Sequence, residues 1–322
     1  MPISVIISNL NGLKYLPRLM ETLGQQQNVE IEIIVVDRHS TDGSLEYLRQ
    51  FQDVRVVSET PITGLVSGYA AGAAVARHDL LFFCNEDMWF DPLCLFHLEQ
   101  QICLSRGVAA ADPWQWTYDG KVLIHGGTRF DRCHWAWNSP FPRRRFDFTA
   151  PLTTGQKVPF PCAGAVLMHR SVYDQVGGWD TSFFLDHEDI DLFIRVWQRG
   201  WECVSVPEAK VYHAVGVSSG KTLNNGQRVA PRRYISGRSN LAVIALKYYS
   251  GWALSLAGAS LFVPLAGDVI RLRWQKLWLD LRAVALTYKR MGAIRRFRRA
   301  NKTWSKVKPG LQFFLQKDMT HP

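Results

Sequence analysis

The sequence predicts an α/β domain in which a mostly parallel sheet is flanked by helices, followed by a helical, basic C-terminal tail. Short apolar runs rich in β-branched residues alternate with helical stretches through the first half of the chain. Hydrophobic residues make up 47% of the 322 residues and charged residues 20%, which fits a chain that buries a sizeable core. The net charge of +10 is concentrated near the end, where fourteen Lys and Arg accompany two Asp from Arg271 onward.

The first half of the chain reads as strands separated by helices. The expected strands are Ile3–Ile7, Ile31–Val36, Val54–Val57 and Leu80–Cys84, and the helices between them are Tyr15–Gln26, Ser44–Phe51 and Gly68–Ala76. Such alternation predicts parallel βαβ units, whose ligands bind beyond the carboxyl ends of the strands. The segments that directly follow these strands are Ser8–Asn11, Asp37–Asp42 and Asn85–Asp87, so they are candidate ligand-binding segments.

The second half of the chain is less regular. Asp112–Pro161 is rich in Pro, Trp and Arg and predicts loops and short hairpins. After it we expect the strands Cys162–His169, Glu202–Val206 and Lys210–His213, the helices Ser171–Val176 and Asp189–Arg199, and a helical region beyond about Arg232.

Two of the strand ends carry carboxylates. Asp37 precedes a well-capped helix and can accept hydrogen bonds from a nucleobase or ribose, although Asp37 and Asp42 can also serve only to cap turns and helix ends. Asn85-Glu86-Asp87 is an acidic cluster at the end of an apolar strand, where Mg²⁺ or Mn²⁺ can lie between protein and phosphate oxygens. The alternative for this cluster is a solvated acidic turn.

A second acidic segment lies further along the chain. Four carboxylates fall within six residues, namely Asp186, Glu188, Asp189 and Asp191. Crowded like charges are costly unless a site uses them, and one of them near a hydroxyl group can act as a general base. The dipole of a helix that begins here also favours acidic residues. A lone histidine, His213, ends the last predicted strand and is either structural or a further metal ligand.

These segments, in this order, resemble the family 2 glycosyltransferases of the GT-A fold over about residues 1–220. Val5–Gly12 is similar to the family's opening strand and first donor loop, and Asp37 with the following Ser-Thr-Asp-Gly-Ser is similar to its nucleotide-binding segment. Asn85-Glu86-Asp87 stands in the place of the DxD motif, with Asn85 replacing its first Asp. Tyr69 stands where relatives commonly have Asn.

The resemblance extends through the second half. Gly177–Asp191 is similar to the GG(W/F)D…FF…EDxDL segment of the family, and His213 falls where the family often has a metal-binding histidine. The implied organisation is a GT-A domain over residues 1–230, with a nucleotide-binding half at 1–111 and an acceptor half at 112–230, and a helical, membrane-associating tail at 231–322.

The resemblance implies an inverting, metal-dependent transferase that moves a hexose or a deoxyhexose such as rhamnose from a nucleotide-diphosphate sugar. The acceptor is expected to be a glycan or a lipid-linked glycan, in cell-surface polysaccharide assembly. The competing interpretation is a catalytically silent glycan-binding or scaffold protein on the same fold.

The resemblance also implies roles for individual residues. It assigns the donor to Ser8, Asn11, Asp37, Asn85, Glu86 and Asp87, and a divalent cation, Mn²⁺ or Mg²⁺, to Asp87 and His213. Asp189 is the expected general base, with Glu188 as the alternative. Trp179 and Phe184 are expected to stack on the acceptor sugar, and core packing is the alternative for both.

The composition of the C-terminal tail predicts attachment to a membrane surface. Tyr248–Gly267 is a run of twenty uncharged residues, for which an in-plane or re-entrant helix is expected and a full span is the alternative. Lys289–Lys308 reads as an amphipathic basic helix with Ile294, Phe297, Trp304 and Val307 on its apolar side; a solvated helix docked on the body is the alternative.

Composition and the start of the chain bear on location. No nucleic-acid-binding module accompanies the positive charge, so nucleic acid is not an expected partner. Met1-Pro2 leads directly into an apolar strand without a basic region, and the six cysteines form no CxxC pair. We therefore expect a cytoplasmic protein with reduced thiols, attached peripherally to the inner face of the membrane.

Overall fold

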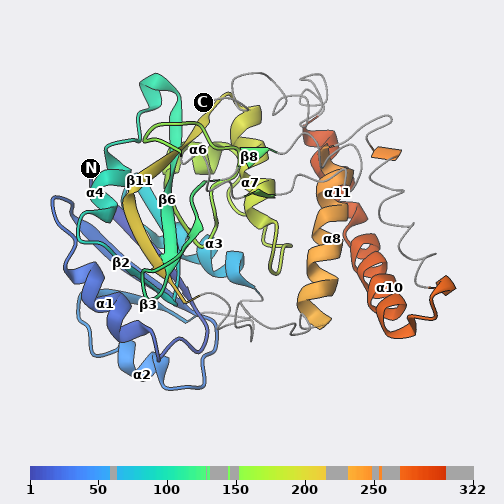
Figure 1. Ribbon diagram of the computed structural model, residues 1–322, viewed down its shortest axis with the longest axis horizontal. Helices are drawn as coiled ribbons and strands as arrows, with labels where there is room; N and C mark the ends of the chain where they lie inside the picture. The colour runs from blue at the N-terminus through green and yellow to red at the C-terminus, as the bar shows by residue number, and fades with distance from the viewer. Residues whose placement is uncertain are drawn as a thin grey trace.

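A computed structural model describes residues 1–58, 64–127, 129–130, 144–145, 152–214, 231–248, 254–255 and 269–301. Nine strands of the described residues form one large sheet, and two further strands form a small hairpin. Helices pack against the sheet, and the last helices of the chain stand together at one side of this body (Figure 1).

The first half alternates strands and helices as the sequence predicts. The strands are β1 (Ile3–Asn9), β2 (Ile31–Asp37), β3 (Val54–Val57) and β4 (Leu80–Asn85), and the helices are α1 (Leu16–Gly24), α2 (Ser44–Leu48) and α3 (Leu65–Val75). All seven residues of β1 are buried, because the strand is central and covered on both faces.

The second half contributes the remaining strands and several short helices. The strands are β5 (Met88–Phe90), β6 (Val108–Thr117), β7 (Leu123–His125), β8 (Arg129–Phe130), β9 (Arg144–Arg145), β10 (Ala165–His169) and β11 (Glu202–His213). The helices are α4 (Cys94–Glu99), the 3₁₀ helix η1 (Leu104–Arg106), α6 (Arg170–Gln175) and α7 (Glu188–Gln198).

The sheet is parallel in its first half and mixed in its second, which corrects the expectation of a mostly parallel sheet. The strand order is β3-β2-β1-β4-β10-β6-β11-β5, with β7 paired to β6. β10 runs antiparallel to both β4 and β6, whereas β11 is parallel to β6. The carboxyl ends of β1, β2, β4 and β11 therefore lie at the same edge. A strand reached through loops needs no crossover helix, so helix spacing could not predict the direction of β10.

The region expected to be irregular, Asp112–Pro161, begins inside a regular strand. β6 continues to Thr117 and pairs with β11, and the pairing shifts register just after Pro113, where a proline is tolerated. Asp112 is fully buried in this strand and accepts hydrogen bonds from His125 Nε2 at 2.8 Å and from the backbone N of Cys162 at 3.2 Å. Residues 128, 131–143 and 146–151 of this region lie outside the described residues.

Among the described residues after β11, the named helices are α8 (Pro231–Tyr248), α10 (Trp274–Lys289) and α11 (Met291–Ala300). Ile244 and Tyr248 of α8 and Ile294 of α11 belong to the same buried core as Phe83 of the sheet. Phe297 also packs against this core. The apolar side of α11 is therefore occupied by the body, as in the docked alternative, while Trp304 and Val307 lie outside the described residues.

The long uncharged run, Tyr248–Gly267, is described only at Tyr248, Leu254 and Ser255. Over the part of the chain that the structure describes, no helix has the length and apolar character needed to cross a bilayer.

Candidate functional site

Asp87 and His213 meet at the sheet edge because the backbone brings them together. Asp87 lies in the turn between β4 and β5, and β5 pairs antiparallel with the end of β11, so that Met88 stands opposite His213. The backbone N of Ala214 donates to the backbone O of Asp87 at 3.0 Å. As a result, His213 Nε2 lies 3.1 Å from Asp87 Oδ1.

The contact between these two side chains fits a shared cation. His213 Nδ1 lies 3.2 Å from Gln115 Oε1, and a ring that donates its Nδ1–H to this oxygen leaves Nε2 able to act as a ligand beside Asp87. Asp87 Oδ1 is buried and has no hydrogen-bond partner among the described residues. In that tautomer the two ligand atoms face each other at 3.1 Å, which suits a shared divalent cation, with Gln115 orienting the imidazole.

To such a cation this pair would supply two protein ligands. Within the described ranges no group of three or more His, Cys, Asp or Glu side chains is placed to hold a metal ion. Mg²⁺ and Mn²⁺ sites that use substrate phosphates need only one or two carboxylates, so the small number of protein ligands is compatible with such a site.

Glu86, next to Asp87, is almost completely buried. Its Cγ would lie 2.7 Å from a Cβ at Gly12, so the absence of a side chain at Gly12 allows this packing. Burial raises the pKa of Glu86 to about 8, and the charge of Asp87 adds to the rise while Arg38 opposes it. Glu86 is thus buried within the electrostatic influence of Arg38, and its role toward a donor stays a prediction.

Arg38 is a residue of this edge that the sequence argument missed. Burial lowers the pKa of its guanidinium, and the charges of Glu86 and Asp37 oppose that effect. Arg38 Nε makes no hydrogen bond within the described part of the chain. A half-buried guanidinium with a buried, unsatisfied Nε–H beside the strand ends is chemically suited to a phosphate or a ribose. Its position directly after Asp37 was the available signal.

Asp37 and Asn11 organise the loops after β1 and β2. Asp37 accepts from Asn9 Nδ2 at 2.7 Å and from the backbone N of Ser40 at 2.9 Å. Asn11 has a positive φ of 55° and its Oδ1 accepts from the backbone N of Thr41 at 2.8 Å. Asp37 therefore makes the turn-capping contacts expected under the alternative interpretation, in which it only caps turns. Its role in binding a donor stays a prediction.

Ser8 and Asn85 are tied to α3. Ser8 is fully buried and donates to the backbone O of Leu65 at 3.0 Å. Tyr69 donates from its hydroxyl to Asn85 Oδ1 at 2.8 Å. The hydroxyl of Tyr69 thus orients the amide that replaces the first carboxylate of the DxD motif.

Asp189 and Glu188 stand in the first turn of α7. Asp189 Oδ2 accepts from the backbone N of Ala163 at 3.2 Å, and the backbone O of the next residue, Gly164, accepts from the backbone N of Asn85 at 2.9 Å. One short loop therefore links the expected base to the β4 strand end. Glu188 lies close enough to Tyr69 for its charge to contribute to raising the pKa of that phenol, after the larger effect of burial.

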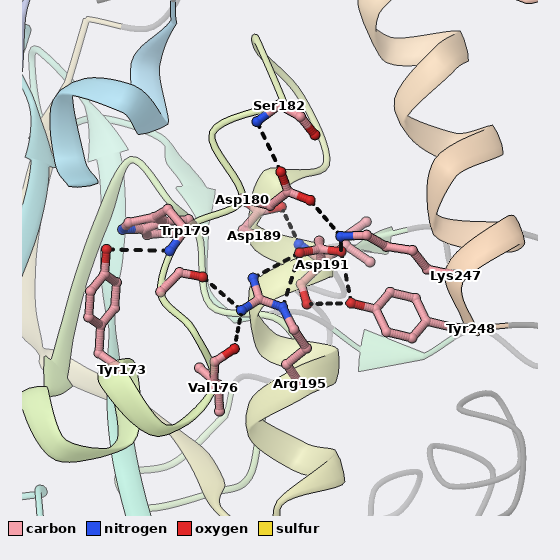
Figure 2. Close-up of polar contacts among 12 residues, drawn as sticks. Tyr173, Val176, Trp179, Asp180, Ser182, Asp189, Asp191, Arg195, Lys247 and Tyr248 are labelled. Atoms are coloured by element: carbon pink, nitrogen blue, oxygen red, sulfur yellow. Dashed lines mark hydrogen bonds and ion pairs between the residues drawn. The ribbon is translucent and has the colours of Figure 1, made fainter. Parts of the chain in front are cut away.

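Asp191, another carboxylate of the acidic segment, is neutralised by cations, and one of these cations also contacts Asp180 (Figure 2). Asp191 is fully buried; it accepts from Arg195 Nε and Nη2 at 3.1 and 2.8 Å, from Lys247 Nζ at 2.7 Å and from the hydroxyl of Tyr248 at 2.8 Å. Lys247 also contacts Asp180 at 2.6 Å. Burial acts to raise the pKa of Asp191, but the charges of Lys247 and Arg195 outweigh it and hold that pKa well below its usual range.

A strained turn precedes α7, and α8 holds it. Asp186 and His187 both have positive φ, at 69° and 68°, which is rare for residues other than glycine. Arg233 of α8 forms a double contact with the Asp186 carboxylate at 2.7 and 2.8 Å. Asn240 Nδ2 donates to the backbone O of Leu185 at 3.0 Å and of Asp186 at 2.7 Å. These contacts fix the turn that presents Glu188 and Asp189.

The two aromatic residues assigned to the acceptor have different environments. Trp179 is buried and packs on Tyr69 and Phe83, with ring centroids 5.6 and 5.4 Å away, which is the core-packing alternative. Phe184 is half-buried, and Arg232 of α8 stacks over its ring at 4.0 Å. Only Phe184 of this pair retains an accessible ring.

The protein belongs to the class of α/β folds whose ligands bind beyond the carboxyl ends of the strands, where its acidic side chains gather. The chain belongs to a specific family within that class: the family model for glycosyl transferase family 2 matches residues 4–177, more than half of the chain. The resemblance noted from the motifs is thereby confirmed.

Relatives of known activity agree with this membership. The chain is 27% identical over 223 residues to polypeptide N-acetylgalactosaminyltransferase 6 of Homo sapiens, covering 63% of this chain but only 35% of that protein. It is 25% identical over 238 residues to the N-acetylglucosaminyl-diphospho-decaprenol L-rhamnosyltransferase of Mycobacterium tuberculosis, covering 64% of this chain and 74% of that protein. The chain thus spans about a third of the length of the first relative.

Solved structures share the fold. The crystal structure of GalNAc-T7 with UDP, GalNAc and Mn²⁺ superposes with a TM-score of 0.59 at 18% identity, covering 76% of this chain and 48% of that one. The body is therefore a GT-A-like fold with a mixed sheet.

Proposed function

We propose that this chain is an inverting glycosyltransferase that moves a sugar from a nucleotide-diphosphate donor to a glycan or lipid-linked acceptor. The observation that carries the proposal is the approach of Asp87 Oδ1 and His213 Nε2 to 3.1 Å without a hydrogen bond, at the strand edge where nucleotides bind in such folds. Family membership supplies the reaction class, and the rhamnosyltransferase among the relatives supports a role in cell-surface polysaccharide assembly.

Asp87 and His213 would hold a divalent cation, Mn²⁺ or Mg²⁺, as suits a fold whose solved relative binds UDP and Mn²⁺. When bound, such an ion neutralises negative charge that develops on the leaving diphosphate. Among the chain's own residues, Asn85 is held by Tyr69 for contact with the donor, and Arg38 presents an unsatisfied N–H near the same edge.

Asp189 is the residue we propose as general base. It stands in the first turn of α7, and the 163–164 backbone connects it to the Asn85 end of β4. From that position its carboxylate accepts the proton of the acceptor hydroxyl as the hydroxyl oxygen attacks the anomeric carbon and the nucleoside diphosphate leaves. Attack from the face opposite the leaving group inverts the anomeric centre. Glu188 is the second candidate on the same turn.

Substitution of Asp189 tests the assignment. We expect Asp189→Asn to abolish transfer, by at least about 10²-fold, while nucleotide binding measured by calorimetry persists. Asp119→Asn, which changes an exposed acid in the β6–β7 turn, is the matched control and retains full activity. Wild-type turnover by Asp189→Asn assigns the base elsewhere, and Glu188→Gln is then the next variant.

A screen of nucleotide sugars, with and without EDTA, tests the rest of the proposal. Metal-dependent donor hydrolysis by the wild type, lost in Asp87→Asn and in His213→Ala, is the expected result. A wild type that binds donors but turns over none of them identifies the silent glycan-binding or scaffold protein instead.

We also propose that the protein works at the cytoplasmic face of a membrane, where nucleotide sugars and a lipid-linked acceptor meet. The supports are the basic C-terminal region and the decaprenol-linked substrate named for the mycobacterial relative.

A further inference from the structure

The outer face of α10 carries a continuous exposed apolar stripe. Trp274, Trp278, Leu281 and Tyr288 have 59, 54, 52 and 78% of their surface exposed. Their spacing of four, three and seven residues places them on one side of the helix, together with the exposed Ala285. Single exposed hydrophobic residues are ordinary, but an aligned group of this size marks a contact surface.

The opposite face of α10 is already occupied by the body. Asp280 is buried and accepts from the hydroxyl of Tyr234 at 2.8 Å, and Thr287 donates to Ser239 Oγ at 3.0 Å. Ala283 is buried on the same side. The helix is therefore anchored to α8 and cannot rotate to hide its stripe, and it stands on the side of α8 away from the sheet (Figure 1).

Positive charge surrounds the stripe. Residues 269–301 contain ten Lys and Arg and a single Asp, and that Asp280 is buried against α8. Arg271, Arg273 and Arg282 are exposed on α10 or just before it, and Arg282 lies 4.6 Å from the centre of the Trp278 ring. This charge is complementary to an anionic surface.

A cavity lies at the edge of the stripe. It has a volume of about 240 Å³ and opens between α8 and α10. Its apolar walls come from Leu246 of α8, Val284 and Tyr288 of α10, and Met291 of α11. Tyr288 belongs to both the stripe and the cavity, so an apolar chain that contacts the stripe can extend into the space behind it.

We propose that the outer face of α10 is a docking surface for an anionic lipid bilayer. Exposed Trp and Tyr on one helix face, flanked by arginines, combine the groups that favour the interface of a bilayer and the headgroups of acidic lipids. Protein interfaces, by contrast, deplete charged residues around their apolar centre. This proposal rests on the proposed attachment to a membrane and names the surface responsible. It assigns that surface to α10, because the apolar side of α11 packs on the body.

Vesicle flotation with the full chain tests this surface. We expect the wild type to float with vesicles of phosphatidylcholine containing about 30% phosphatidylglycerol, and more weakly with phosphatidylcholine alone. The triple variant Trp274→Ser/Trp278→Ser/Tyr288→Ser should bind the anionic vesicles about tenfold more weakly or worse. Val122→Ser, which removes an exposed hydrophobic side chain in the β6–β7 turn, is the control and floats like the wild type.

The charge arm uses a matched pair of variants. Arg271→Gln/Arg273→Gln should weaken binding to anionic vesicles several-fold, whereas Arg49→Gln/Arg106→Gln, which removes two exposed arginines elsewhere, should leave it nearly unchanged. Circular dichroism verifies that the variants are folded, and the single variant Tyr288→Ser provides an intermediate loss if the triple variant misfolds.

Three results overturn the proposal. They are failure of the wild type to float, flotation of the triple or Tyr288→Ser variant at the wild-type level, and a concentration-dependent dimer that the triple variant abolishes without vesicles. The last result assigns the stripe to a second copy of the chain. Donor hydrolysis is measured in the same samples without vesicles; its absence alongside normal flotation counts against the proposed enzyme and leaves the docking surface standing.

Discussion

Replacing Lys247 by methionine probes the contact that joins α8 to the acidic segment. The Lys247 side chain is only 5% exposed, and its ammonium group lies 2.6 Å from Asp180 and 2.7 Å from Asp191. Methionine keeps the apolar stem but removes the charge. Asp191 would then depend on Arg195 and Tyr248 alone, and Asp180 would lose its closest cation.

The expected loss of stability is about 3 kcal/mol. Removing one partner of a buried ion pair costs about 3–5 kcal/mol because the remaining charge stays buried. The lower end applies here, since Arg195 still contacts Asp191 through two nitrogens. For a chain of 322 residues, with an unfolding entropy of about 2.1 cal/mol/K per residue, such a loss lowers the midpoint of thermal unfolding by about 4 °C.

Urea unfolding followed by circular dichroism measures this loss. The matched control is Lys121→Met, because the Lys121–Asp119 pair is 3.3 Å long but 78% and 55% exposed, and such pairs contribute under about 1 kcal/mol. A loss below about 1 kcal/mol for Lys247→Met would refute the argument that this lysine is needed to compensate buried charge. The double variant with Asp180→Asn measures the coupling directly.

The same experiment has a pH arm. The folded pKa of Asp191 is held below its ordinary value of 3.8, so its ion pairs contribute stability above about pH 4, and that contribution disappears only as the pH falls through the depressed pKa. The difference between wild type and Lys247→Met should therefore stay constant from pH 7 to about pH 5 and shrink at lower pH. A difference that grows on acidification contradicts this assignment.

Two further substitutions separate packing from positioning. Gly72→Ala in α3 should destabilise the protein by about 1–3 kcal/mol in the same urea assay, because the new Cβ would overlap Ile6 Cγ2 in the core. The control is Gly24→Ala at the end of α1, where nothing lies within 4 Å of the new Cβ. This variant should be neutral or slightly stabilising. Asn240→Ala removes the donor to the carbonyls of Leu185 and Asp186, so kcat should fall about tenfold or more with little change in the donor KM; an unchanged kcat shows that the strained turn does not need this contact.

The sequence predicted which site residues lie at the ends of strands. Asp87 follows a clear apolar strand and His213 ends another, so both could be assigned to strand ends from the residues alone. Their contact follows from the pairing of β5 with β11. β5 is only three residues long and gives no periodic signal, so no pattern in the chain indicated that pairing. The resemblance to a family supplied the missing step.

The sequence argument failed where acidic residues are neutralised by cations far away in the chain. It noted that four carboxylates crowded near α7 are costly unless a site uses them, with the helix dipole as the alternative, and it assigned no partner to Asp186 or Asp191. Arg195 lies four residues after Asp191, but the other compensating cations, Arg233 and Lys247, lie more than forty residues downstream on α8. No local pattern links these two cations to the acidic segment. The sequence therefore could not predict that Asp186 and Asp191 form ion pairs with α8 and so differ from Glu188 and Asp189.

The ion pairs of α8 with Asp186 and Asp191 make α8 part of the candidate site as well as of the C-terminal tail. Asp186 and Asp191 flank Glu188 and Asp189 in sequence, and both flanking carboxylates are held by cations of α8. Because the flanking charges are neutralised, Glu188 and Asp189 experience less electrostatic repulsion. The contacts of α8 also fix the turn that carries them at both ends. If Asp189 is the base, its position depends on α8, so a chain that ends before α8 should lose transfer even where the sheet and the Asp87–His213 pair remain intact.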